Sequence, residues 1–512
     1  MLAKVFSSAT LGVDAYMVEV EADIQQQLPL FITVGLPDGA VRESKERVTA
    51  AIKNSDFVFP AKKVTINLAP ADIKKEGSAF DLPIAVGILA ATGQILRDRF
   101  DEYVMLGELS LDGALRAVPG VLPMTMNVAS GNGIKGILVP PENAREAAMA
   151  GTVPVYPVKS LREAVAFLED ESTIRPHTID IQSVFDEARR YPVDFSDVKG
   201  QEAAKRALEI SAAGGHNIIM VGPPGSGKTM LARRVPSILP DMTIREALET
   251  TKIHSVAGRL SANSALVATR PVRSPHHTIS YAGLIGGGTI PKPGEVSLSH
   301  NGVLFLDELP EFKKDILEML RQPMEDNQVT ISRASTTLTY PARFMLIAAM
   351  NPCPCGYHGD PNHECNCTSG EIQRYMNRIS GPLLDRIDIH ISVPSVKFKE
   401  LSSESKGSVS SVIRARVNAA RNRQLERFKA VPGVYCNAQM ESRDTRKYCC
   451  LDDQSQALLA TAIKRQGLSA RAYDRILKVA RTIADLDGSE AIQMGHIAEA
   501  IHYRSLDRSL WL

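Results

Sequence analysis

The sequence predicts an α/β protein in three parts: a mixed α and β N-terminal part, a core with a parallel sheet, and a helical C-terminal part. Three observations support this prediction. Short apolar runs alternate with helical patterns from about Gly200 to Pro394, which is typical of a parallel sheet covered by helices. Strand-like and helical segments mix before residue 168, and after Pro394 the apolar residues recur at a spacing of three to four.

The length of 512 residues exceeds what a single hydrophobic core supports, so we expect several domains. The predicted parts are an N-terminal domain over 1–168, a linker or docking arm over 169–198, a core over 199–394 and a helical lid over 395–512. The linker is predicted because its polar stretch has no sustained apolar period. The core contains a cysteine-rich loop at 353–367.

Composition narrows the function classes. Hydrophobic residues make up 44% of the chain and charged residues 23%, which is ordinary for a soluble protein. The net charge of +1 gives no global field for a polyanion, so any nucleic-acid binding requires local basic patches. The longest apolar stretch, residues 80–96, contains Asp81 and Pro83 and predicts a core element instead of a membrane span. With no sustained apolar run before Asp14 and an odd cysteine count, we expect a cytoplasmic protein without a membrane partner.

A phosphate-binding loop is the strongest motif in the chain. An apolar strand at Ile218–Val221 runs into a glycine-rich turn and then a helix, so backbone N–H groups and the helix N-terminus would face phosphate oxygens. We expect Lys228 to reach the β- and γ-phosphates of ATP and Thr229 to ligate Mg²⁺. The predicted nucleotide-binding residues are Gly222, Pro223, Pro224, Gly225, Ser226, Gly227, Lys228 and Thr229.

Two further buried strands are predicted to complete this site. The segment GVLFLDELPEF ends in Asp307, which would hold Mg²⁺ through water, and Glu308, which would polarise the attacking water. The segment FMLIAAMN ends in Asn351, whose amide would orient that water against the γ-phosphate. The alternatives are a solvated strand end for the two carboxylates and a plain turn residue for Asn351.

Two arginines are candidates for charge stabilisation. Arg386 precedes an alternating strand, and Arg471 stands at the start of a helix in the lid. An arginine supplied by a neighbouring subunit can stabilise transition-state charge. Taken alone, either residue would more often form a surface salt bridge.

The order of these motifs resembles that of the AAA+ ATPases, in the branch of the magnesium-chelatase ATPase subunit and the MCM helicases. Over nearly its whole length the chain looks like the magnesium-chelatase-like ComM/YifB family, on the segments GPPGSGKT, RSPHHTISYAGLIGGG, VLFLDELPEF, NPCPCG, RISGPLLDRID and LSARAYDRILKVARTIADL. The resemblance implies a P-loop core, a homo-hexameric ring with ATP between subunits, and arginine-finger roles for Arg386 and Arg471. It also implies a DNA helicase that promotes branch migration in natural transformation. The alternative is a chelatase-like ATPase that remodels a protein partner without binding DNA.

The core also contains a predicted hairpin and a pair of neighbouring histidines. The segment DNQVTISRASTTLTYPARF predicts a hairpin with Arg333 near its tip. Such hairpins face the ring channel in the relatives, so we expect Arg333 to contact DNA phosphates, with an exposed hairpin charge as the alternative. His276 and His277 suggest no mechanism by their chemistry alone, and a structural loop explains them equally well.

The N-terminal part resembles the proteolytic domain of Lon, which implies a Lon-protease-like (ribosomal S5 domain 2-like) fold. Lon-type chemistry needs a serine activated by a lysine. In this sequence Ala79 stands at the serine position, with Ser78 one position away, and Leu122 stands at the lysine position. We therefore expect a scaffold without the catalytic dyad, used for DNA binding or for ring assembly.

Four cysteines within fifteen residues form the last candidate site. Two Cys-x-Cys pairs separated by nine residues suit tetrahedral Zn²⁺, although the spacing within each pair is tighter than usual. The predicted ligands are Cys353, Cys355, Cys365 and Cys367. His358 or His363 could replace one of them, and a reduced thiol-rich loop or a redox pair are the alternatives. A structural zinc would stiffen the connection from Asn351 to Arg386 without being catalytic.

Overall fold

The computed structural model describes residues 2–96, 99–128, 133–170, 172–187, 193–260, 266–288, 291–333, 336–396, 407–431, 433–504 and 506. The chain forms two compact units. The first consists of Met1–Arg189, Ile244–Ala268 and Ala334–Tyr340, and the second of Arg190–Thr243, Thr269–Arg333 and Pro341–Leu512. Among the residues described, no helix combines the length and the apolar character needed to cross a membrane.

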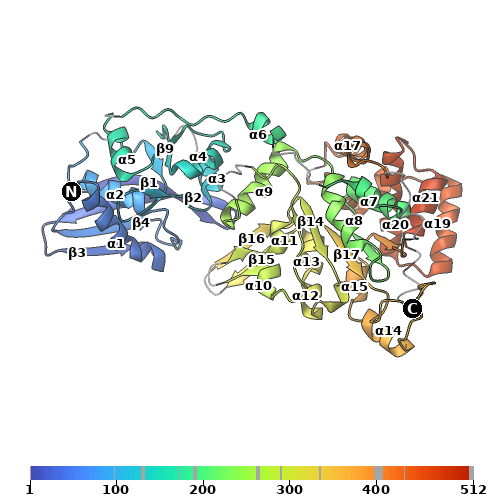
Figure 1. Cartoon of the computed structure of the whole chain (residues 1–512). Coiled ribbons are helices and arrows are strands. Elements are labelled where there is room, and N and C mark those ends of the chain that lie inside the picture. Colours follow the sequence, from blue (N-terminus) through green and yellow to red (C-terminus); the bar gives the residue numbers. More distant parts are fainter. Residues whose placement is uncertain are drawn as a thin grey trace. The chain divides into compact units, whose positions relative to one another are not determined.

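The first unit is a mixed α/β structure (Figure 1). Its strands are β1 (Leu2–Leu11), β2 (Asp14–Gln25), β3 (Leu30–Val34), β4 (Lys63–Ala69), β5 (Tyr103–Met105), β6 (Glu108–Leu109), β7 (Leu115–Arg116), β8 (Gly136–Val139) and β9 (Val155–Pro157). Its helices are α1 (Gly39–Asn54), α2 (Asp81–Ala91), α3 (Val121–Asn127), α4 (Pro141–Ala148), α5 (Leu161–Leu168), α6 (Ile181–Glu187) and α9 (Ile244–Val256).

A seven-stranded sheet organises the first unit, in the order β3-β4-β2-β1-β5-β8-β9. Strand β2 is antiparallel to both β1 and β4, whereas β5, β8 and β9 run parallel to one another. Helix α2 packs against β1 and β2. All eleven residues of α2 are buried, because the segment is apolar on every side and therefore suits a core position. The apolar stretch at residues 80–96 thus contains a core helix, as predicted.

The second unit is α/β in its first part and helical after residue 407 (Figure 1). Its strands are β10 (Ile218–Val221), β11 (Val272–Arg273), β12 (Gly286–Gly287), β13 (Lys292–Pro293), β14 (Gly302–Leu306), β15 (Gln328–Arg333), β17 (Phe344–Met350) and β18 (Ile389–Ser392). Its α-helices are α7 (Glu202–Gly214), α8 (Lys228–Arg234), α10 (Tyr281–Leu284), α11 (Glu295–Leu298), α12 (Lys314–Met319), α13 (Arg321–Asp326), α14 (Ser369–Met376), α15 (Gly381–Leu384), α17 (Ser410–Arg427), α18 (Ser442–Tyr448), α19 (Asp453–Gln466), α20 (Ala470–Leu486) and α21 (Met494–His502). Short 3₁₀ turns are η1 (Phe195–Asp197), η2 (Val235–Ser237), η3 (Leu309–Glu311) and η4 (Asn437–Gln439).

The five-stranded sheet of the second unit is parallel, as predicted, with the order β11-β14-β17-β10-β18. Every residue of β10 and of β14 is buried, which agrees with the uninterrupted apolar runs of their sequences. Neighbouring parallel strands end at the same edge of a sheet. The residues that follow β10, β14 and β17 are therefore brought together at one edge.

The C-terminal helices share an apolar core with this sheet. Ile218 of β10, Val417 of α17 and Ile476 of α20 all belong to one buried cluster. A buried polar contact ties α20 to the start of β18, since Asp388 pairs with both Arg475 and His216. Burial alone would raise the pKa of Asp388, but the charge of Arg475 and the hydrogen bond from His216 outweigh it and hold that pKa well below its usual range.

Two segments bear on the sequence expectations. The predicted hairpin is present as a two-stranded sheet of β15 and β16 (Thr336–Pro341), and Arg333 is the last residue of β15. The polar stretch predicted as a linker contains the short helix α6. Phe185 in that helix is 3% exposed, so the segment buries an aromatic side chain although it has no sustained apolar period.

Candidate functional site

The predicted phosphate-binding residues lie at the edge of the parallel sheet where β10, β14 and β17 end. The loop from Gly222 to Gly227 follows β10 and leads into α8. Gly225 and Gly227 have φ values of +74° and +90°, and a Cβ built on either would meet no atom within 4 Å. The loop therefore combines a backbone that favours glycine with open space beside it, as a phosphate cradle requires.

Lys228 is held inside this loop by oxygen atoms. Its Nζ donates to the carbonyl oxygens of Gly222 at 2.7 Å and Pro223 at 2.9 Å, and it lies 3.3 Å from Ser226 Oγ. It also donates to Asn351 Oδ1 at 3.2 Å. Burial lowers the pKa of Lys228 to about 8, partly opposed by the charge of Asp307. The ammonium group is thus kept at the sheet edge by neutral oxygens, in a position where a phosphate would supply a negative partner.

The two residues predicted to hold Mg²⁺ contact each other. Thr229 Oγ1 donates to Asp307 Oδ2 at 2.6 Å, and Asp307 Oδ1 accepts from the backbone N–H of Glu308 at 3.0 Å. Hydroxyl and carboxylate oxygens are the hard ligands that Mg²⁺ prefers, and a protein site for it usually supplies only one or two of them. These two residues therefore fit a magnesium site completed by nucleotide phosphates and water.

Glu308 has an unusual backbone. Its φ and ψ are 52° and 47°, in the left-handed region that non-glycine residues adopt at a cost of about 1–2 kcal/mol. Its side chain is 60% exposed, and the carboxylate Oε2 lies 3.7 Å from His277 Nδ1. The sequence suggested no mechanism for His277, and the structure places it beside the predicted catalytic glutamate.

The two predicted arginine fingers lie elsewhere. Arg386 is 7% exposed; its guanidinium pairs with Glu325 and donates to the Pro382 carbonyl at 2.6 Å. The side chain of Arg471 is 64% exposed and lies 4.0 Å from the Asp385 carboxylate. In the part of the chain that the structure describes, neither guanidinium contacts Lys228, Thr229 or Asp307. A residue that serves a neighbouring subunit need not contact the site of its own chain, so their roles stay predictions.

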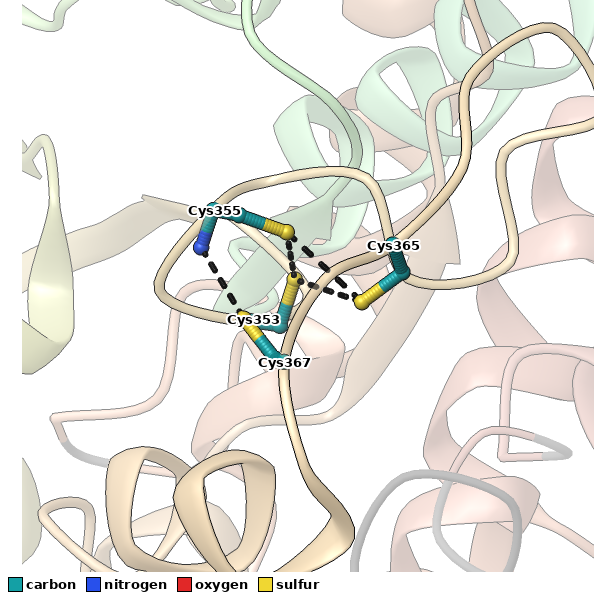
Figure 2. Close-up of side chains that lie close together, drawn as sticks. All are labelled: Cys353, Cys355, Cys365 and Cys367. Carbon is teal, nitrogen blue, oxygen red and sulfur yellow. Dashed lines mark hydrogen bonds between the residues drawn. The ribbon is translucent and has the colours of Figure 1, made fainter.

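The four predicted zinc ligands converge (Figure 2). Cys353 Sγ lies 3.3 Å from Cys355 Sγ and 3.7 Å from Cys365 Sγ, and all four sulfur atoms are within 4.8 Å of one another. Four sulfurs at about 2.3 Å from a tetrahedral zinc would be about 3.8 Å apart. The distances are therefore close to those of a tetrahedral S₄ site and too long for disulfides, which need about 2.05 Å.

Local hydrogen bonds reach two of these thiols, Cys353 and Cys355. Cys353 Sγ accepts from the backbone N–H of Gly356 at 3.2 Å and of His358 at 3.3 Å. A hydrogen bond from the Tyr357 backbone contributes most to lowering the pKa of the Cys355 thiol to about 6, whereas burial raises the pKa of the Cys353 thiol to about 12. The four cysteines form the cluster without a histidine ring.

His363, which the sequence offered as a substitute ligand, instead stacks on Tyr357 with ring centroids 4.7 Å apart. The cysteine loop also touches the phosphate-binding loop. Gly356 has a φ of +89°, and a Cβ built on it would lie only 2.6 Å from Cδ of Pro224. No side chain fits at this position, so the two loops approach each other by way of a glycine. The cysteine cluster begins two residues after Asn351 and packs on the loop that holds Lys228.

The remaining predicted residues are also placed. Arg333 is exposed at the end of β15, and its Nη2 would lie 3.1 Å from a Cβ built on Gly287. In the first unit, Ala79 and Leu122 are buried, and the Ser78 hydroxyl donates to Glu108. The two positions that the sequence comparison assigned to the serine and the lysine thus hold buried apolar side chains.

Comparison with known families covers most of the chain. Residues 194–401 match the family described as magnesium chelatase, subunit ChlI. Residues 20–143 match the description subunit ChlI of Mg-chelatase, and residues 407–504 match the ChlI C-terminal description. The three matches follow the chain in order.

Individual relatives extend the match to the full length. The protein YifB of Escherichia coli strain K12 is 46% identical over 512 residues, which covers 99% of this chain and 98% of YifB. Competence protein ComM of Haemophilus influenzae is 43% identical over 512 residues, with the same coverage. Lon protease 2 of Bacillus subtilis is 31% identical over 153 residues, 28% of this chain and 27% of that protease, so the Lon likeness is partial. From the three family matches and the full-length similarity to YifB and ComM, the chain belongs to the magnesium-chelatase-like ComM/YifB family.

Proposed function

We propose that this protein is a magnesium-dependent ATPase of the AAA+ type that assembles as a ring and acts on DNA. The observation that carries the ATPase proposal is the convergence at one sheet edge, where Lys228 contacts Asn351 and Thr229 contacts Asp307. These contacts join residues that follow three different strands of a parallel sheet, the position at which such sheets bind their ligands.

Each residue has a defined part in the proposed reaction. Lys228 would exchange its carbonyl partners for the β- and γ-phosphates, Thr229 would ligate the magnesium ion, and Asp307 would hold it through water. Bound Mg²⁺ would neutralise charge on the phosphates. Glu308 accepts a proton from the attacking water, and Asn351 orients that water. Arg386 and Arg471 would serve the nucleotide between neighbouring subunits of a homo-hexameric ring.

We propose branch migration of DNA during natural transformation as the physiological activity. The name competence protein ComM, carried by a relative with 43% identity, supports this choice. Arg333 would contact DNA phosphates, because it is exposed at the end of a hairpin strand. The alternative is remodelling of a protein partner without DNA, which the three matches to a chelatase subunit support.

Three further assignments complete the proposal. The cysteine cluster binds a structural zinc that braces the chain between Asn351 and Arg386, since four protein ligands leave no open position for catalysis. The N-terminal domain over 1–168 has a Lon-protease-like fold used as a scaffold, and residues 395–512 form the lid of the ATPase core. We propose a cytoplasmic location, where a reducing environment keeps the thiols available for zinc.

The decisive experiment measures ATP turnover of the purified protein alone, with single-stranded DNA and with branched DNA, using Lys228→Ala as the blank. A several-fold increase with DNA that is absent from the blank supports the DNA motor. Turnover that no DNA changes would reject the motor and favour the protein-remodelling alternative.

The proposed DNA contact of Arg333 is tested further by the salt dependence of DNA binding in two arginine variants. Arg333→Ala should weaken DNA binding and reduce the salt dependence of the affinity by roughly one phosphate contact. Arg443→Ala, also an exposed arginine in the second unit, is the matched control and should leave both unchanged. Equal effects of the two substitutions would remove Arg333 from the proposed DNA contact.

A further inference from the structure

The His277 ring packs beside two other rings. Its ring lies against that of His276, with centroids 4.1 Å apart, and meets the ring of Phe312 edge-on at 6.3 Å. Phe312 follows the 3₁₀ turn η3 and is 3% exposed, so its ring is packed into the protein interior. His276 is itself restrained, because its Nδ1 lies 2.9 Å from the Thr278 hydroxyl. The His277 imidazole thus has a ring on two sides, and its side chain is 32% exposed.

The Glu308 side chain is more exposed than that of His277. Its backbone is fixed in a left-handed conformation, but its side chain is 60% exposed and has three rotatable bonds. Holding such a side chain in one geometry costs rotamer entropy. A group that activates water must nevertheless be positioned closely, since an error of about 1 Å can reduce a rate about 10²-fold.

The side chains of His277 and Glu308 lie close together at one edge of the sheet. Strand β11 pairs in parallel with β14, with Val272 opposite Val303 and Arg273 opposite Leu304. The loops that follow these strands therefore leave the sheet at the same edge, and His277 Nδ1 comes to 3.7 Å from Glu308 Oε2. This contact joins an imidazole that packs against other rings to a carboxylate that is largely exposed.

We infer that His277 is a positioning residue for Glu308, restricting the glutamate to the geometry in which it accepts a proton from the attacking water. The inference rests on the proposed ATPase function and names a residue that this function did not yet use. His277 acts through Glu308 and touches no reacting atom. Its contribution should therefore fall on the rate of hydrolysis and not on the affinity for nucleotide.

The test compares two substitutions at position 277. His277→Phe keeps a ring against His276 and Phe312 but removes the nitrogen that faces Glu308. His277→Asn loses ring area but places an amide nitrogen near the position of Nδ1, from which it can donate to the carboxylate. His502→Phe, an exposed histidine in α21, is the matched control.

We expect kcat for ATP to fall about tenfold in His277→Phe, with KM and the Kd for a fluorescent ATP analogue within about twofold of wild type. His277→Asn should recover kcat to within about threefold, and His502→Phe should match wild type. Thermal unfolding of all three variants, followed in parallel, shows whether each is folded.

Two results would overturn the inference alone. One is a wild-type kcat in His277→Phe, and the other is an equal loss in His277→Phe and His277→Asn accompanied by a raised KM, which indicates a structural role. A wild-type chain that binds the ATP analogue but does not hydrolyse ATP would instead overturn the proposed function, and the inference with it. The wild-type rate thus separates the two failures.

Discussion

Two buried lysines, one in each unit, have different surroundings. Lys75 in the first unit is fully buried, burial lowers its pKa, and its Nζ donates to the Ile73 carbonyl at 2.7 Å. Lys228 in the second unit is 8% exposed, and burial lowers its pKa to about 8. Its Nζ, however, lies among oxygens of the phosphate-binding loop and of Asn351.

The comparison of Lys75 with Lys228 shows how a functional lysine differs from one that is merely buried. Both lysines have the lowered pKa that often marks functional groups. Only at Lys228 do several strands bring further polar groups to the same place, including the Thr229–Asp307 pair. A perturbed lysine indicates function when other groups converge on it, and otherwise indicates only burial.

The largest effect should follow substitution of Lys228. Lys228→Met should reduce ATP turnover by at least about 10²-fold, because it removes the charge that binds the phosphates. It should also stabilise the nucleotide-free protein by up to about 3 kcal/mol at pH 7, since a shift from 10.5 to about 8 opposes folding of the charged form. Steady-state turnover and urea unfolding measure the two effects.

The lowered pKa of Lys228 also predicts how the stability of the wild-type protein changes with pH. Between pH 8 and 10.5 the unfolded chain holds the Lys228 proton and the folded chain does not, so wild-type stability should rise with pH across this window. Lys228→Met should lack that rise. A variant that is less stable than wild type without nucleotide would contradict the view that the ammonium group is held there at a cost.

The next effect concerns the buried ion pair of the first unit. Arg47 Nε lies 2.6 Å from Asp81 Oδ2, and the Asp81 side chain is fully buried. Burial raises the pKa of Asp81 to about 6, although Arg47 opposes the shift. Arg47→Ala should cost about 3 kcal/mol of unfolding free energy at pH 7, because it leaves a buried carboxylate without its partner.

This loss should depend on pH in a defined direction. A folded pKa of about 6, above the ordinary 3.8, means that the contribution of Asp81 to stability is fully present below about pH 4 and declines as the pH rises through 6. Removing Arg47 raises the folded pKa further, so the loss should be largest above pH 6 and small near pH 4. Urea unfolding at pH 4.5 and 7.5 tests this, with the exposed Arg42→Ala in the same helix as control. Equal losses at both pH values would count against it.

A smaller effect is expected from alanine substitutions at two glycines of the cysteine loop. Gly356 and Gly359 both have positive φ, at +89° and +78°, but only a Cβ on Gly356 would meet Pro224. Alanine at either position should cost about 1 kcal/mol from backbone strain. Only Gly356→Ala should also raise KM for ATP several-fold, by displacing the phosphate-binding loop. An unchanged KM in Gly356→Ala would show that the two loops are energetically independent.

The smallest effect is expected at Lys75. Lys75→Met should leave ATP turnover within about twofold of wild type and should not lower stability, because it replaces a buried ammonium by an apolar chain of similar length. The same turnover and unfolding assays apply. A large loss of turnover would mean that the first unit takes part in hydrolysis and that the two lysines are more alike than their surroundings indicate.

The sequence predicted the parallel sheet and its central strands well. Strands β10, β14 and β17 each contain an uninterrupted apolar run, followed by a glycine-rich loop after β10 and by polar residues after β14 and β17. Local composition was therefore sufficient to locate both the strands and the edge. The convergence of the four cysteines was also predictable, because they lie within fifteen residues of one another. These features depend on local sequence.

The features that the sequence missed depend on contacts between distant segments. Strand β11 has only two residues, too few for a periodic pattern, yet its pairing with β14 brings His277 to Glu308. The burial of Arg386 against Glu325 joins the segment that follows α15 to α13, and these segments share no common motif. Each of these contacts is set by the packing of the whole unit, which no window of the sequence contains.

The strand order has a consequence for how the protein is synthesised. Ile218 of β10 pairs with Ile347 on one side and with Ile389 on the other, so both neighbours of this strand leave the ribosome long after it does. Until then β10 is an apolar strand with unpaired backbone groups, the kind of segment that pairs with other chains. A ribosome that stalls before residue 389 would release a chain with one edge of β10 uncovered. We therefore expect prematurely terminated products of this gene to aggregate, and the full-length protein to depend on chaperones while residues 218 to 392 are being translated.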